Sequence, residues 1–306
     1  MGDEFTRREV LFALSSLGIS ACAARGVASA EQLPRRLIPA TGEELAIVGL
    51  GSTKPVRYIA EAGTGPVESV IRMLMSYGGN VVDTSPRPAE LDEQFGRVLN
   101  EPDIRDEIFV AAKVKVEGRD AGIASIEQTR RLFGRETLDL MQIESMIDYE
   151  TQWPTLKDMK ERGHARYIGV TVASENLYEQ LESFMKAERP DFVQLNYSVM
   201  EYSAEDRLLP LAEDLGIAVL VNGPFMNGEY FGFVRGHELP AWAAEFDCES
   251  WAQFSLKYIL AHPAVTCVLT ETTKPVHMED NARAGLGLFP DAATKRRMRE
   301  YAASLV

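Results

Sequence analysis

Short apolar segments recur along the chain, and most neighbouring pairs are separated by a segment with the apolar spacing of an amphipathic helix. An apolar run with few polar interruptions is typical of a strand that is buried on both faces of a parallel sheet. The sequence therefore predicts eight strands, at residues 45–51, 80–84, 108–114, 138–144, 165–171, 191–197, 217–223 and 265–270.

Strands and helices that alternate eight times indicate an α/β fold, and we expect the sheet to close into a (β/α)8 TIM barrel. An open doubly wound sheet is the alternative, but no Gly-x-Gly-x-x-Gly opens the first unit, so the Rossmann form would lack its phosphate-binding turn. The predicted helices lie at residues 66–78, 89–100, 123–134, 153–163, 175–188, 204–216 and 250–263.

The first 30 residues do not fit this pattern. Arg7 and Arg8 precede an apolar run at residues 10–24, and the small residues 28–30 follow. This order predicts a twin-arginine signal peptide, cleaved after Ala30, and a periplasmic or other extracytoplasmic location for the barrel at residues 31–306. Two alternatives stay open. The segment could be a first amphipathic helix, or the tetrad ending at Cys22 could be a lipoprotein box that leaves the chain lipid-anchored.

Composition and charge narrow the possible partners. The 306 residues are 45% hydrophobic and 25% charged, as in an ordinary globular protein, and the net charge is −14. A chain this acidic lacks the electrostatic attraction that supplies most affinity for nucleic acid, so we expect no nucleic acid partner and no anionic membrane surface. We expect a monomer that acts on a small molecule, with the twin-arginine export machinery as its partner during secretion.

The cysteines and histidines indicate neither a disulfide nor a metal site. After the predicted cleavage only Cys248 and Cys267 remain, and Cys267 lies inside a predicted strand, which favours a core cysteine over a disulfide. The four histidines have no spacing typical of metal ligands, so we expect no metal site.

Three ionisable residues stand at or near the ends of consecutive predicted strands: Asp83, Lys113 and Glu144. In a TIM barrel the carboxyl ends of the strands and the loops that follow them form the active site. We therefore expect the three side chains to meet at one mouth as catalytic residues. Three separate structural ion pairs are the alternative.

Eight sequence blocks make the chain resemble the aldo-keto reductase family, barrel enzymes that transfer hydride between a nicotinamide cofactor and a carbonyl. The resemblance covers nearly all of the chain after about Leu45, and the blocks occur in the family's order. They are GGNVVDTSP with the FGRVL that follows it, IFVAAKV, LDLMQIESMID, GHARYIGV, PDFVQLNYS, LLPLAEDLGIAVLVNGPF and LAHPAVTCVLTETTKPVHMEDNARA.

The resemblance implies a catalytic Asp, Tyr, Lys and His, of which this chain keeps Asp83 and Lys113. Pro88 stands at the tyrosine position and Glu144 at the histidine position. Proline has no proton to give, so carbonyl reduction would need another general acid. One branch of the family has a glutamic acid at this histidine position and reduces a double bond conjugated to a ketone. On this reading Glu144 supplies the proton or orients the substrate.

The resemblance also implies NADP(H) as the cofactor, with departures at three points. Thr171 and Val172 replace the residues that hold the carboxamide, Asn222 replaces the stacking aromatic, and the carboxylate of Glu271 would repel a cofactor phosphate. The positions that correspond to the family's cofactor site are Gly51, Ser52, Thr171, Gln194, Asn222, Thr272, Thr273, Lys274, His277 and Asn281.

The leading hypothesis is an exported NADP(H)-dependent oxidoreductase that reduces a carbonyl or a conjugated double bond. One alternative is a lyase or isomerase that uses Lys113 and Glu144 for proton transfer and has lost nicotinamide chemistry. Another is a non-catalytic ligand-binding barrel. The loops after the first and seventh strands are expected to line the mouth, and their aromatic residues either contact the ligand or pack on the rim.

Overall fold

The computed structural model describes residues 31–306. The predicted export signal and Cys22 lie outside the described residues. Within residues 31–306 no helix is both long and apolar enough to cross a membrane.

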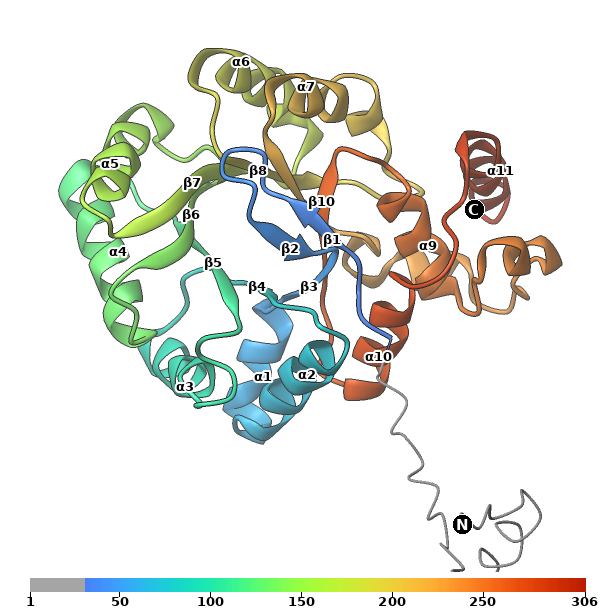
Figure 1. The fold of residues 1–306 in the computed structure, drawn as a ribbon, viewed down its shortest axis with the longest axis horizontal. Helices are drawn as coiled ribbons and strands as arrows, with labels where there is room; N and C mark the ends of the chain where they lie inside the picture. The colour runs from blue at the N-terminus through green and yellow to red at the C-terminus, as the bar shows by residue number, and fades with distance from the viewer. Residues whose placement is uncertain (1–30) are drawn as a thin grey trace, which may run out of the picture. The chain divides into compact units, whose positions relative to one another are not determined.

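Eight parallel strands close into a barrel in the order β10, β3, β4, β5, β6, β7, β8, β9 (Figure 1). All eight predicted segments contain one of these strands, so the (β/α)8 barrel is confirmed and the open doubly wound alternative is wrong. The strands are β3 Val48–Gly51, β4 Val81–Asp83, β5 Phe109–Val114, β6 Leu138–Glu144, β7 Ala165–Thr171, β8 Phe192–Asn196, β9 Ala218–Asn222 and β10 Val265–Thr270.

A ring of helices surrounds the barrel (Figure 1), and it includes all seven predicted helices. Their buried residues recur at helical spacing; in α2, for example, Val67, Val70, Ile71 and Leu74 are buried. The described helices are α1 Thr53–Ala62, α2 Gly65–Ser76, α3 Ala89–Leu99, α4 Arg119–Leu132, α5 Tyr149–Glu161, α6 Tyr178–Glu188, α7 Leu208–Leu215, α8 Tyr230–Phe233, α9 Trp251–Leu260, α10 Pro275–Arg283 and α11 Ala292–Ala303.

The segment after β3 was expected to be a loop lining the mouth, and the structure corrects this to helix α1. Pro55, Val56 and Ile59 are buried on one face of the helix, which lies beside α2 and α3. Pro55 stands in the first turn, where its missing N–H costs nothing.

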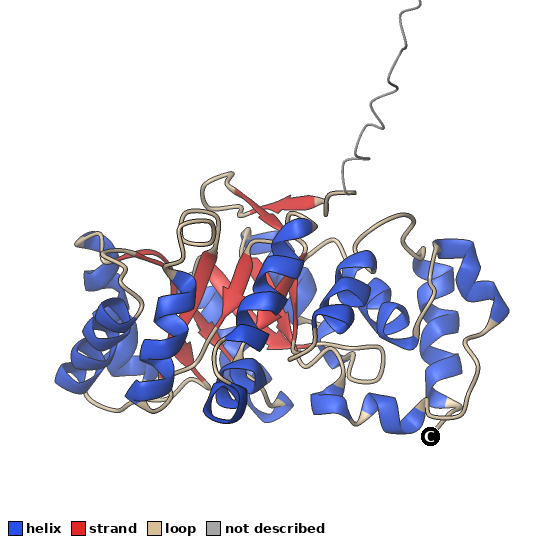
Figure 2. Ribbon diagram, turned by 90° about the horizontal axis from the view of Figure 1, so that it is seen from below, coloured by secondary structure: helices blue, strands red, loops and turns tan. Residues whose placement is uncertain are grey.

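A hairpin that the sequence analysis missed covers the amino end of the barrel. Strands β1 Arg35–Leu37 and β2 Glu44–Ala46 pair antiparallel, and Figure 2 shows them at one end of the barrel. Ile38 and Leu45 are fully buried in the cluster of apolar side chains that fills the barrel interior. The predicted strand at 45–51 therefore contains the end of β2 and all of β3. This closed end leaves the carboxyl ends of the strands as the open mouth.

Candidate functional site

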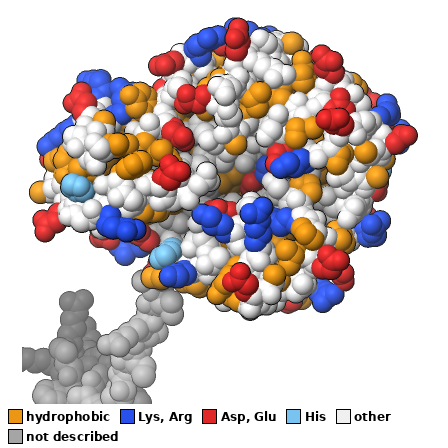
Figure 3. Space-filling view, turned by 180° about the vertical axis from the view of Figure 1, so that it is seen from behind, with side chains coloured by type: hydrophobic (Ala, Val, Ile, Leu, Met, Phe, Trp, Pro, Cys, Tyr) orange, Lys and Arg blue, Asp and Glu red, His pale blue; other side chains and the backbone are white. Residues whose placement is uncertain are grey.

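The carboxyl ends of the strands surround a hollow on the face opposite to the hairpin, and Lys and Arg side chains gather along part of its rim (Figure 3). Asp83 is the last residue of β4, Lys113 is the next-to-last residue of β5, and Glu144 is the last residue of β6. The strand register therefore brings all three to this mouth, hereafter the barrel mouth.

The Lys113 ammonium and the Asp83 carboxylate form a buried pair. Lys113 Nζ donates to Asp83 Oδ1 at 2.5 Å and to the carbonyl oxygen of Thr84 at 3.3 Å. The two side chains are only 5% and 11% exposed. Burial of either charge alone would be strongly unfavourable, so each depends on the other. An ammonium has three N–H groups, and these two contacts leave one of them available to a ligand.

Gln194 contacts the other oxygen of the Asp83 carboxylate, and Gln142 in turn holds Gln194. Gln194 Nε2 lies 3.3 Å from Asp83 Oδ2, and Gln142 Nε2 donates to Gln194 Oε1 at 2.8 Å. Gln194 was expected at the site, whereas Gln142 was missed. Its signal in the sequence is alternation, because Gln142 lies two residues before Glu144 and therefore on the same face of β6.

Glu144 pairs with a lysine that the sequence analysis did not single out. Its Oε1 accepts a hydrogen bond from Lys115 Nζ at 2.6 Å, whereas Glu144 was expected beside Lys113. The register explains this correction. Lys113 is paired with Gln142 across β5 and β6, so Lys115 comes level with Glu144 two residues further on. Glu144 Oε2 is buried and has no hydrogen-bond partner in the described chain.

Arg87, next to the proline that replaces the tyrosine, is a third residue that sequence reasoning missed. Its guanidinium donates to Thr84 Oγ1 at 2.7 Å, to Ser52 Oγ at 3.1 Å and to Asp92 Oδ1 at 3.3 Å. Burial lowers the pKa of Arg87, and the charge of Asp92 opposes that shift. Pro88 itself is the N-cap residue of α3. The guanidinium thus links the ends of β3 and β4 to the first turn of α3.

The expected nicotinamide positions lie at the ends of β7, β8 and β9. Thr171 and Val172 are buried. Asn222 Nδ2 donates to Asn196 Oδ1 at 2.7 Å, while Asn222 Oδ1 is buried without a partner. Asn196 Nδ2 in turn donates to the carbonyl oxygen of Ala173 at 3.2 Å. Amides, rather than an aromatic ring, therefore stand where the family's stacking residue was expected.

The expected phosphate loop follows β10 and leads into α10. Thr272 Oγ1 accepts from the backbone N–H of Lys274 at 3.1 Å and lies 3.4 Å from His277 Nδ1. Lys274 and His277 are exposed, whereas Asn281 is buried. Glu271 does not extend over this loop, because its carboxylate contacts α1 instead. The remaining expected positions, Gly51 and Thr273, are half-buried and Ser52 is buried.

The aromatic residues of the β9–α9 segment divide into two groups. Phe225 and Tyr230 are buried and stack on each other, and the Tyr230 hydroxyl donates to the carbonyl oxygen of Trp251 at 3.0 Å. Phe231 of this segment remains exposed, as does Tyr58 of α1. Phe225 and Tyr230 therefore pack this segment onto the barrel rim.

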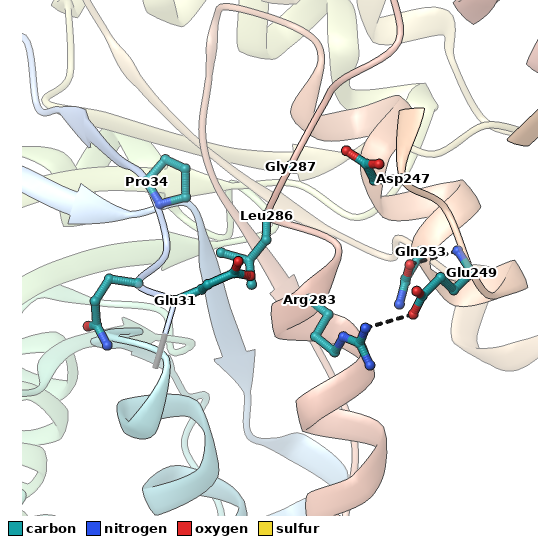
Figure 4. Close-up of a pocket in the computed structure, with 9 residues that line it drawn as sticks. Glu31, Pro34, Asp247, Glu249, Gln253, Arg283, Leu286 and Gly287 are labelled. Carbon is teal, nitrogen blue, oxygen red and sulfur yellow. Dashed lines mark hydrogen bonds and ion pairs between the residues drawn. The ribbon is translucent and has the colours of Figure 1, made fainter. Parts of the chain in front are cut away.

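Two cavities of about 500 and 450 Å³ lie away from these residues. Figure 4 shows the larger one, where Arg283 of α10 forms an ion pair with Glu249 at 2.8 Å, near Glu31 and Pro34. The smaller one lies between Trp153 and the loop after α6. Neither contains a residue expected at the site. Residues 31–306 hold no group of His, Cys, Asp and Glu side chains arranged for a metal ion.

Comparison with known proteins decides the family. Residues 66–296 match the model of the Aldo/keto reductase family. The chain belongs to this family. Its relatives include the aldo-keto reductase YhdN of Bacillus subtilis, 25% identical over 205 residues that cover 61% of each chain. Another is the NADH-specific methylglyoxal reductase of Escherichia coli, 24% identical over 176 residues that cover 49% of this chain and 52% of that protein. The chain thus spans about half to three fifths of these relatives.

Solved aldo-keto reductase structures share the fold. The glycerol dehydrogenase AKR11B4 from Gluconobacter oxydans has a TM-score of 0.73 at 19% identity, covering 91% of this chain and 97% of that one. An aldo-keto reductase from Klebsiella pneumoniae in complex with NADPH also has a TM-score of 0.73, at 17% identity, covering 89% and 95%. This chain therefore shares the barrel fold of the family, and its relatives include oxidoreductases.

Proposed function

We propose that this chain is an exported NADP(H)-dependent oxidoreductase that reduces a carbonyl or a conjugated double bond in the barrel mouth. The observation that carries the proposal is the buried pair of Lys113 and Asp83, with Lys113 Nζ 2.5 Å from Asp83 Oδ1. A buried charge pair at the open end of a TIM barrel stands where the substrates of such barrels react. Membership of the Aldo/keto reductase family supports reduction as the reaction.

Lys113 is the proton donor in this proposal. Two of its N–H groups bond to Asp83 and Thr84, so the third can donate to the reacting oxygen of the substrate. Asp83 holds the ammonium in place, and Gln194 and Gln142 hold Asp83. Such a preorganised donor stabilises the negative charge that develops on the oxygen during reduction.

Glu144 orients the substrate in this proposal. Lys115 Nζ donates to its Oε1 at 2.6 Å, and this ion pair fixes the position of the carboxyl group at the mouth. Lys113, which needs no rearrangement to donate, takes the place of the missing tyrosine.

The residues present fit a nicotinamide dinucleotide at both of its ends. The unpartnered Asn222 Oδ1 can accept from the carboxamide, and the exposed Lys274 and His277 at the start of α10 can hold phosphate. Glu271 is withdrawn from the phosphate loop by its contact with Lys54. When bound, the cofactor supplies the hydride.

The test uses the full chain with Arg7→Lys and Arg8→Lys, which keeps it in the cytoplasm where nicotinamide nucleotides are present. The purified protein is expected to show NADPH fluorescence or to bind added NADPH in a titration. Lys113→Met should keep that binding and lose about 100- to 10,000-fold in turnover. Full turnover in Lys113→Met, or product formation without any nucleotide, would exclude this mechanism, and the second result would favour a lyase or isomerase.

A further inference from the structure

Two prolines stiffen the segment that joins β4 to α3. Pro86 and Pro88 stand on either side of Arg87, and each ring fixes its own φ and favours an extended backbone in the residue before it. Pro88 itself is extended in the structure. Because the segment has few conformations to lose on folding, it can hold Arg87 in one place beside the barrel mouth.

The Arg87 side chain turns back toward β4 and is only 5% exposed. Its guanidinium donates to the hydroxyls of Thr84 and Ser52 and to the carboxylate of Asp92. Asp92 Oδ2 also accepts from the backbone N–H of Arg87 at 2.9 Å. The backbone and the side chain of Arg87 thus bind the same carboxylate, and this double contact fixes the direction of the guanidinium.

Arg87 is connected to both groups that hold the Lys113 ammonium. Lys113 Nζ donates to the carboxylate of Asp83 and to the carbonyl oxygen of Thr84. Arg87 bonds directly to the Thr84 hydroxyl, and Thr84 is 2% exposed. It reaches Asp83 through Ser52, whose backbone N–H donates to the carbonyl oxygen of Asp83 at 2.9 Å. Displacement of Arg87 would therefore loosen both acceptors of the ammonium.

The charges of this buried group balance. Lys113 pairs with Asp83 and Arg87 pairs with Asp92, and the four side chains are between 5% and 11% exposed. Burial lowers the pKa of Arg87, and the charges of Asp92 and Asp83 oppose that shift. Arginine suits this place, because its planar guanidinium meets several acceptors in fixed directions, whereas lysine carries a compact charge on a flexible chain.

We infer that Arg87 is a positioning residue for Lys113: held by the two prolines, it fixes Thr84 and Ser52, and these keep the ammonium in one orientation. The inference rests on the proposed function for the reaction, in which the third N–H of Lys113 is the proton donor. It also gives Pro88 a role. The proline that replaces the family's tyrosine stiffens the segment through which Arg87 positions Lys113 as the donor.

The orientation of the ammonium can be measured without any reaction. The full chain with Arg7→Lys and Arg8→Lys is grown with isotope-labelled lysine for NMR of the side-chain ammonium groups. The Lys113 signal is assigned from its absence in Lys113→Met. An ammonium that is held in a buried pair exchanges its protons slowly with water and gives a sharp signal, whereas a loosened one exchanges quickly and loses its signal.

Two variants loosen the predicted connection in different ways. Arg87→Lys keeps the charge but not the fork of donors, and Arg87→Met combined with Asp92→Asn removes both charges together, so no unpaired charge is left buried. Arg135→Lys is the matched control, because Arg135 is a half-buried arginine that bonds to the carbonyl oxygen of Leu99 and precedes the start of β6, away from the mouth. Urea unfolding checks that every variant is folded.

The second measurement is reduction of 4-nitrobenzaldehyde and of 2-cyclohexenone, with NADPH and with NADH. In both Arg87 variants kcat should fall by about tenfold or more, because the donor is displaced. KM for the carbonyl compound should change by about twofold at most, because the rest of the mouth is intact. A residue that only stabilised the fold would lower the folded fraction and leave kcat of the folded protein unchanged.

The Lys113 signal is expected to be sharp in the unchanged protein and in Arg135→Lys, and to lose most of its intensity in both Arg87 variants. A signal that stays sharp in both Arg87 variants, one that is equally lost in Arg135→Lys, or its absence from the unchanged protein would overturn the inference, as would an unchanged kcat. Loss of the signal only in the Arg87 variants, in a chain that reduces neither compound, would support the inference and count against the proposed function.

Discussion

The carboxylate of Glu271 lies against the first turn of α1, where it accepts from the backbone N–H of Lys54 at 2.7 Å and lies 3.6 Å from the Lys54 ammonium. A negative charge at a helix N-terminus is favourable, because the first N–H groups of the helix have no partner within it. The residue that was expected to repel a cofactor phosphate therefore stabilises a helix in this structure.

The Glu271→Lys variant separates the effect of this residue on cofactor binding from its effect on the stability of α1. The replacement adds a positive charge beside the loop, so NADPH should bind about tenfold more tightly or better if the loop after β10 faces a phosphate. The same change removes the acceptor from α1 and should cost about 0.5–2 kcal/mol of unfolding free energy. Fluorescence titration and urea unfolding measure the two effects. Glu271→Ala is the control, with the stability loss but without the added positive charge, so its affinity should change little. Unchanged affinity in Glu271→Lys would show that this loop has another role.

Pro88→Tyr tests the missing proton donor. Tyrosine at this position supplies the phenol that the family uses, so reduction of a small aldehyde should be faster than in the unchanged protein if the cofactor site is intact. The N-cap geometry of Pro88, φ −49° and ψ 133°, is open to tyrosine as well. Initial rates with NADPH are compared between this variant and Pro88→Phe, which has the ring without the hydroxyl. Equal rates in the two variants would show that the phenol donates no proton here.

Arg87→Met tests the link between β3, β4 and α3. Without the guanidinium, Asp92 keeps a buried carboxylate with no cation beside it, so the variant should lose about 3–5 kcal/mol of unfolding free energy. Adding Asp92→Asn should return part of that loss, because the second change removes the unpaired charge. Urea unfolding of the two single variants and the double variant gives the coupling energy. Losses that simply add would mean that the two side chains do not interact.

Glu205 holds α11 against the barrel. Its Oε1 accepts from Lys295 Nζ at 2.7 Å, from the Tyr258 hydroxyl at 2.9 Å and from the Tyr197 hydroxyl, and its Oε2 accepts from Arg299 at 3.2 Å. Burial raises the pKa of Glu205, but these hydrogen bonds and the Lys295 charge outweigh burial, so the pKa is lowered. The folded protein therefore favours the ionised carboxylate more strongly than the unfolded chain does.

The lowered pKa of Glu205 predicts how the stability of the protein changes with pH. The stability from Glu205 is fully present above the usual glutamate pKa of about 4.3 and is lost as the pH falls through the lower folded value. Glu205→Gln should lower the unfolding free energy by about 1–3 kcal/mol at pH 7 and by less at pH 3. Urea unfolding at both pH values measures this difference. An equal loss at pH 7 and pH 3 would show that the carboxylate charge is not what the network needs.

The sequence by itself determined the architecture and the positions of the first site residues. A strand buried on both faces needs an almost continuous apolar run, so all eight barrel strands could be predicted from their composition. Asp83, Lys113 and Glu144 interrupt or end those runs, and parallel strands bring such residues to one end of the barrel. The family could be recognised for the same reason, because its motifs lie at those strand ends.

Only the tertiary structure decided which of these residues meet. Glu144 pairs with Lys115 because the register of β5 and β6 sets Lys113 level with Gln142. The residues of either strand alone do not determine that register. The hairpin of β1 and β2 was missed because three-residue strands carry too little periodic signal. Arg87 has three side-chain partners, from the β3 end, the β4 end and α3, and these come together only when the barrel closes. Pairing between distant segments depends on the distances that folding creates, whereas burial of a strand depends on its own side chains.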